Sequence, residues 1–95
     1  MELNETDDVA TLNHKLCLSI NKTIDLTEQL KSSGGEFNSS KVNVLKAKTP
    51  EELVEAKIAR QEAEGKFKEL QALIRCQKEI TMGIKTLLKA ETGHL

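Results

Sequence analysis

Aromatic residues are nearly absent from this sequence of 95 residues, which has two Phe and no Trp or Tyr. Surfaces that stack nucleobases and pockets that enclose drug-sized ligands depend on aromatic side chains. The shortage therefore argues against both kinds of site. Residues that interrupt helices are also few, with one Pro and five Gly. Together with abundant Leu, Glu and Lys, this composition is typical of long helices or coiled coils.

Neither sign of charge predominates, because 15 acidic residues offset 14 basic ones and the net charge is -1. A general binder of nucleic acid or of anionic membranes carries a clear excess of basic residues. The charge balance therefore argues against a nucleic-acid partner and against a membrane partner.

The sequence has no apolar run of the about 18–20 residues that a transmembrane helix needs. Residues 1–8 are mostly acidic and polar, whereas a secretory signal begins with basic residues and continues with apolar ones. Two cysteines, Cys17 and Cys76, are too few for a disulfide framework. We therefore expect a cytoplasmic protein.

A first helix is predicted over residues 6–31. Its apolar residues recur at the spacing of one helix face: they are Val9, Leu12, Leu16, Ile20, Ile24, Leu26 and Leu30. Asp7 and Asp8 suit its first turn, because the helix dipole favours acidic residues there. With Ala10 and Cys17 beside it, the apolar stripe is wider than contact with one helix requires. We therefore expect this helix to pack against more than one neighbour.

The serines and glycines at 32–35 are expected to end this helix, because paired glycines favour a left-handed cap and a turn. Residues 32–48 then form a linker, and whether its part from 36 to 48 is helical stays open. The linker is basic: its charged residues are Lys41, Lys46, Lys48 and a single acid, Glu36.

Lys41, Lys46 and Lys48 are the one candidate anion-binding site, for a small ligand such as a nucleotide. They adjoin the start of the second helix, whose unpaired backbone N–H groups attract anions. The alternative is that Glu51 and Glu52 already occupy this helix end and that the lysines are simply solvated.

The segment from Thr49 to Glu52 predicts the start of a second, long helix over residues 50–91. Thr49 can cap this helix, Pro50 suits its first position, and Glu52 can complete a capping box. Two internal glycines each cost up to about 1 kcal/mol relative to Ala, but no residue forces an earlier end.

The long helix carries a heptad pattern. One set of positions seven apart is Ala56, Ala63, Leu70, Gln77 and Ile84; the other is Ala59, Lys66, Leu73, Ile80 and Leu87, with Phe67, Ile74 and Leu88 beside it. The side chains at these positions are mostly small in the N-terminal half of the helix and large in the C-terminal half. Lys66 and Gln77 break the apolar rule, either to select register or because they lie at the edge of the contact.

The residues that most often bind metals do not form a set. His14 and Cys17 lie three apart on one helix face, which suits two ligands of a zinc site. The other cysteine, Cys76, is expected about 18 Å along the rod from the position facing Cys17, if the chain turns near residue 40. We therefore predict no metal, no cofactor, and two reduced, partly buried cysteines.

Catalytic groups are equally sparse. His14 and His94 are the only histidines, no Ser lies in a nucleophile elbow, and no Gly-rich loop has the spacing that holds a phosphate. Charged residues of the long helix, such as Glu64 and Lys68, are spaced to form solvated pairs along its surface. We therefore predict that the protein is not an enzyme.

The predicted fold is all-α, a single helical unit over residues 1–95: a hairpin of a shorter and a longer helix, completed into a bundle by oligomerisation. Because the first helix is shorter, residues 76–90 are expected to overhang without a partner in the same chain. Self-association, as a dimer, would bury them. The predicted interface residues are Phe67, Leu70, Ile74, Gln77, Ile80, Ile84, Leu87 and Leu88.

Three functions fit these sequence features. The first is a non-catalytic interaction protein, such as an adaptor, inhibitor, chaperone or assembly factor, that lays a helix face on a partner protein. The second is a helical oligomer that sequesters an anionic small ligand at a subunit interface. The third, which the net charge disfavours, is a helical dimer that binds nucleic acid.

Overall fold

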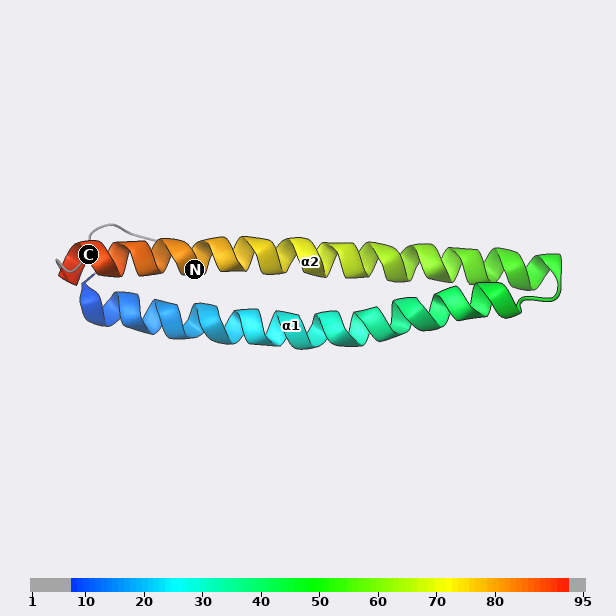
Figure 1. Cartoon of the computed structure of the whole chain (residues 1–95), viewed down its shortest axis with the longest axis horizontal. Helices are drawn as coiled ribbons and strands as arrows, with labels where there is room; N and C mark the ends of the chain where they lie inside the picture. Colours follow the sequence, from blue (N-terminus) through cyan, green and yellow to red (C-terminus); the bar gives the residue numbers. More distant parts are fainter. Residues whose placement is uncertain (1–7, 93–95) are drawn as a thin grey trace.

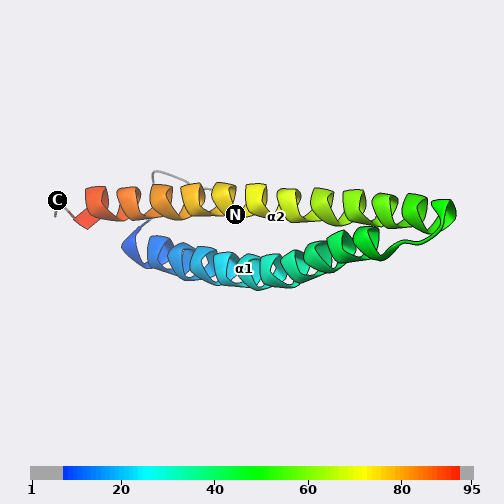
Figure 2. The same cartoon turned by 45° about the vertical axis from the view of Figure 1, so that its right-hand side comes forward.

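The chain folds into two long antiparallel helices that lie side by side (Figure 1). The computed structural model describes residues 8–92. Helix α1 spans Val9–Lys46 and α2 spans Pro50–Thr92. The result is a rod of 66 × 19 × 16 Å with a radius of gyration of 19.9 Å, against about 12 Å for a globular chain of this length. The predicted all-α hairpin is confirmed, and Figure 2 shows its first helix gently curved.

Helix α1 continues through Gly34 and Gly35, so the predicted end at residue 31 and the linker over 32–48 are wrong. A Cβ atom on Gly34 would lie only 3.3 Å from Cε2 of Phe67, so the bare backbone makes room for that ring. The Phe67 ring also packs against Phe37, with 5.8 Å between ring centroids. Packing of these two rings offsets the low helix propensity of the glycines.

The turn of the hairpin lies at residues 47–49, directly before Pro50. A residue that precedes proline is driven out of the helical region by a steric clash, whereas glycine merely permits another conformation. Thr49 is the residue that Pro50 restricts in this way, and the chain has already left the helix at Ala47, which is extended, with φ -62° and ψ 132°. The chain therefore reverses directly before the proline and not at the glycine pair.

The start of α2 confirms the predicted capping by Thr49 and Glu52. The backbone N–H of Glu52 donates to Thr49 Oγ1 at 3.2 Å. The Glu52 carboxylate accepts from the backbone N–H of Lys48 at 3.0 Å, one residue earlier than in a standard capping box. Helix α1 begins similarly, because Asp8 caps it by accepting from the Thr11 N–H at 2.7 Å.

Asp8 therefore precedes α1, and its predicted place in the first turn of the helix is wrong. Residues 6 and 7, the predicted start of this helix, lie outside the described part of the chain. The hydrogen bond from the Thr11 backbone stabilises the Asp8 carboxylate and lowers its pKa.

The two helices meet along one seam, in which contact residues are spaced alternately three and four apart on each helix. All of the seam residues are buried or half-buried. On α1 they are Leu12, Leu16, Ser19, Thr23, Leu26, Leu30, Ser33, Phe37, Ser40 and Val44; on α2 they are Leu53, Ala56, Arg60, Ala63, Phe67, Leu70, Ile74, Gln77, Thr81, Ile84 and Leu88.

This seam corrects the predicted heptad of α2. The set that includes Leu70 and Ile84 lies in the seam as predicted, but it pairs with the set that includes Phe67 and Ile74. The predicted set that includes Leu73 lies on one side of the seam, and its member Lys66 is exposed.

The longer α1 also removes the predicted overhang of residues 76–90. Ser19 lies opposite Thr81, with 2.6 Å between their hydroxyl oxygens, so α1 runs beside this part of α2. Ile84 is 0% exposed within the single chain. Unequal helix lengths therefore give no reason to expect self-association.

The two adjacent glycines of α1 give a matched test of this packing. Gly35→Ala should stabilise the fold by up to about 1 kcal/mol, because a methyl group there meets nothing within 4 Å and alanine favours the helix. Gly34→Ala should gain less or destabilise, because its methyl group meets the Phe67 ring. Urea denaturation of both variants measures the difference. Equal stabilisation would show that Phe67 does not pack against Gly34.

Candidate functional site

A polar layer crosses the seam in the half of the rod away from the turn. Ser19 is 0% exposed, and its Oγ accepts from Nε2 of Gln77 at 2.6 Å. The hydroxyl groups of Ser19 and Thr81 also share a hydrogen bond of 2.6 Å. Gln77 therefore lies inside the contact and bonds across it, in the arrangement by which a polar seam residue can select register.

The polar layer leaves apolar side chains outside the seam. Ile20 and Ile24 were predicted to form part of the apolar stripe, but they are 41% and 51% exposed, because Ser19 and Thr23 occupy the seam beside them. Met82 of α2 is 64% exposed. In this part of the hairpin the polar residues are thus inside and the apolar residues outside.

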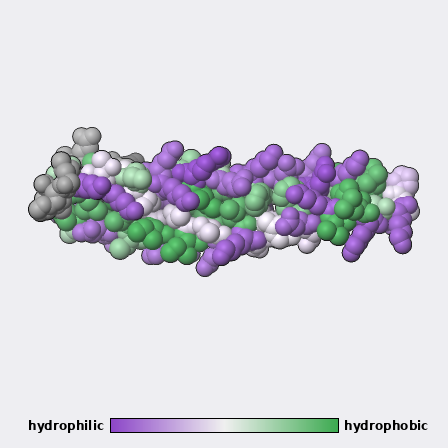
Figure 3. Space-filling view, viewed as in Figure 1, coloured by the Kyte–Doolittle hydropathy of each residue, from purple (hydrophilic) through white to green (hydrophobic). Residues whose placement is uncertain are grey.

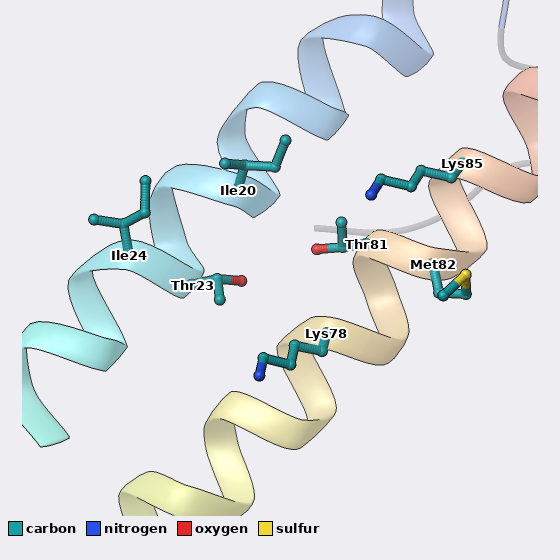
Figure 4. Close-up of a pocket in the computed structure, with 7 residues that line it drawn as sticks. All are labelled: Ile20, Thr23, Ile24, Lys78, Thr81, Met82 and Lys85. Carbon is teal, nitrogen blue, oxygen red and sulfur yellow. The ribbon is translucent and has the colours of Figure 1, made fainter.

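These outer side chains line a groove of about 330 Å³ between the two helices (Figure 4). We call it the Ile20 groove; its lining residues are Ile20, Thr23, Ile24, Lys78, Thr81, Met82 and Lys85. Lys78 and Lys85 extend from α2 toward α1 on either side of Thr81 (Figure 4). Within residues 8–92 neither lysine has an ion-pair partner.

A second hollow lies next to the Ile20 groove, nearer the middle of the rod. It is lined by Leu30, Gln71, Ile74 and Arg75. At 100° per residue, Gln71, Arg75, Lys78 and Lys85 project to the same side of α2. The two hollows therefore follow one side of the hairpin.

The opposite side of α2 carries a line of large apolar residues seven apart, which we call the Leu73 line: Leu73, Ile80 and Leu87. Leu73 is 46% exposed, while Ile80 and Leu87 are half-buried beside the seam. The hairpin thus has an apolar surface on each side of its seam.

The predicted interface is corrected by this arrangement, because six of its eight residues lie in the seam of the same chain. Leu70, Ile74 and Ile84 are buried there, and Phe67, Gln77 and Leu88 are half-buried. Only Ile80 and Leu87 lie beside the seam, on the Leu73 line. Sequence reasoning missed Ile20 and Ile24 as surface residues, since their apolar character favoured the interior.

Two of the three lysines of the predicted anion site, Lys41 and Lys46, lie beside other side chains. The Nζ atom of Lys41 lies 4.1 Å from the centroid of the Phe37 ring. Lys46 shares its hollow with Glu52 and Glu55, and the Glu52 carboxylate already accepts a hydrogen bond from the backbone N–H of Lys48. Carboxylates therefore occupy the place that an anion would need.

Cysteine and histidine do not form a metal site in the described part of the chain. Both Cys17 and Cys76 are free and exposed, so their predicted partial burial is wrong. Among residues 8–92 no three His, Cys, Asp or Glu side chains are placed to hold a metal ion; His94 lies outside this range. Glu64 and Lys68 form the predicted surface pair at 3.0 Å, and the Lys68 ammonium lowers the pKa of Glu64.

Comparison with models of protein families, with curated proteins and with solved structures finds no match for this chain. Neither helix contains, within residues 8–92, a segment long and apolar enough to cross a membrane. The surfaces on the two sides of the seam are therefore the features from which a function can be inferred.

Two buried serines of α1 offer a matched test of the polar layer. Ser19→Ala removes the acceptor of the Gln77 amide and should destabilise by about 1 kcal/mol. Ser33 is 2% exposed and its Oγ has no hydrogen-bond partner, so Ser33→Ala should be neutral or stabilising. Both changes alter helix propensity equally, and thermal or urea unfolding compares them. If the two variants were equally stable, the bond across the seam would contribute nothing.

Proposed function

We propose that the protein is a non-catalytic helical interaction protein of the cytoplasm, an adaptor or assembly factor that completes a helical bundle with other helices. Its first partner is a second copy of itself, bound through the Leu73 line, and its second is another protein. The observation that supports this proposal is the distribution of large apolar side chains. Among residues 8–92, ten of these side chains are exposed and five are buried, and the others are half-buried.

The exposed residues form patches along the rod and are not scattered singly. Figure 3 shows hydrophobic patches between hydrophilic ones over much of its length. Contiguous apolar patches on a protein surface commonly mark sites that bind another protein. The Ile20 groove and the Leu73 line are two such surfaces, on opposite sides of one seam.

The energetics favour the same conclusion. A core of two helices gives a short chain little stability. Burying one large apolar side chain contributes about 1.5–3 kcal/mol, so covering two or three residues of one side matters for the stability of the whole hairpin. Packing against a further pair of helices buries them in the manner of a four-helix bundle.

The Leu73 line suits contact with an identical line better than contact with a charged surface. Cys76 and Gly83, which lie between the three residues of this line on α2, are small and carry no charge, while the charged Glu69 lies one turn before Leu73. Small residues let two helices approach closely. A two-fold axis through such a line gives a closed dimer, the commonest symmetric assembly.

The test is the mass of the protein in solution at about 10 µM, measured by light scattering after size exclusion. We expect a dimer or a larger closed assembly. Leu73→Glu should dissociate it and leave helicity unchanged, because this side chain is 46% exposed in the single chain. Leu45→Glu is the control, since Leu45 is 85% exposed near the turn and should not affect the mass. Ile84 is unsuitable, because it is buried within the hairpin.

A folded wild-type monomer at this concentration would contradict self-association through the Leu73 line. A dimer that Leu73→Glu leaves intact would place the contact elsewhere on the rod and would contradict the proposed surface.

A further inference from the structure

We infer that the Ile20 groove and the adjoining hollow bind an acidic amphipathic helix from a partner protein. This inference rests on the proposed function and specifies one site and the chemistry of one partner. It concerns the side of the seam opposite the Leu73 line.

The apolar lining of the groove is the first reason. Ile20, Ile24 and Met82 are 41%, 51% and 64% exposed, although the seam beside them contains the polar layer of Ser19 and Thr81. A hairpin that functioned alone would be more stable with the isoleucines inside and the hydroxyl groups outside. A third helix packed over the groove would bury these apolar residues.

The length of the surface selects a helix as the occupant. The lining residues of the two hollows run from Gln71 to Lys85 along α2, which is about 21 Å, or four turns of a helix. A groove between two antiparallel helices is where a third helix packs, with apolar side chains every three or four residues pointing into it.

The charge of the lining residues selects an acidic helix. Three of them are basic, Arg75, Lys78 and Lys85, and none is acidic. The chain as a whole has a net charge of -1, so the lining of the two hollows is more basic than the rest of the chain. Docking removes water from the lysines that border the apolar lining, and carboxylates on the partner offset that cost. A basic helix would instead meet three like charges.

The test uses two designed fluorescent peptides as probes. Each is three heptads long, with Leu at the two contact positions of every heptad, and carries either Glu or Lys at the flanking positions. Fluorescence anisotropy with the full chain measures both affinities. We expect the Glu peptide to bind at least about tenfold more tightly than the Lys peptide, with an advantage that falls as salt rises from about 50 mM to 500 mM.

Charge reversal in the groove gives the decisive comparison. Lys78→Glu combined with Lys85→Glu should reverse the preference between the two peptides. Lys57→Glu combined with Lys66→Glu changes the net charge equally at exposed positions outside the groove and should leave the preference unchanged. Met82→Glu should weaken the Glu peptide at least about tenfold, and circular dichroism confirms that each variant remains helical.

Equal binding of the two peptides, binding of neither, or an unchanged preference in the Lys78 and Lys85 variant would each overturn the inference. A change in the mass of the protein alone in that variant would also overturn it, because the occupant would then be a second copy. A folded monomer that binds the Glu peptide would instead contradict only the proposed self-association.

Discussion

The alignment of the two helices depends on one seam whose contact residues repeat every seven positions on both. Apolar residues alone would tolerate sliding of one helix past the other, because leucine and isoleucine layers resemble one another. The hydrogen bonds that join Ser19 to Gln77 and Thr81 have one correct alignment. A shift of one helix by a turn would leave these groups buried without partners, at a cost of about 1–3 kcal/mol for each. Together with the short turn at residues 47–49, the polar layer therefore favours the alignment in which Ser19 lies opposite Thr81.

The same alignment accounts for the surfaces on both sides. Because Ser19 and Thr23 lie inside, Ile20 and Ile24 face outward and form a groove with Met82. The opposite side of α2 presents Leu73 in line with two other large apolar residues. A rod of two helices is too thin to enclose all of its apolar side chains. The polar layer that aligns the helices therefore also leaves apolar side chains exposed. The proposed interaction with other helices would cover these exposed side chains.

Sequence patterns predicted the all-α hairpin and the capped start of α2 at Thr49, and they left open whether Gln77 lies within the contact or at its edge. They failed where a residue lies in a position that its type does not favour. Gly34 looks like a helix end, but the ring of Phe67, 33 residues away in the sequence, packs there and stabilises the helix. Buried serines such as Ser19 do not stand out in a search for apolar residues. Leu30, Phe37 and Val44 are seven apart and continue the apolar pattern across the glycine pair, which was the signal that could have found the longer helix.

The alignment of the helices is tested most directly by whether positions 19 and 81 are neighbours in solution. In a background of Cys17→Ser and Cys76→Ser, the pair Ser19→Cys and Thr81→Cys should form an intrachain disulfide under mild oxidation, detected by mass spectrometry and non-reducing electrophoresis. Disulfides require Cα atoms within about 7 Å. The control pair, Ser19→Cys and Glu62→Cys, should stay reduced, because these positions meet only if the chain turns near residue 40. Cross-linking of the control pair, or none between positions 19 and 81, would contradict the alignment from which both surfaces follow.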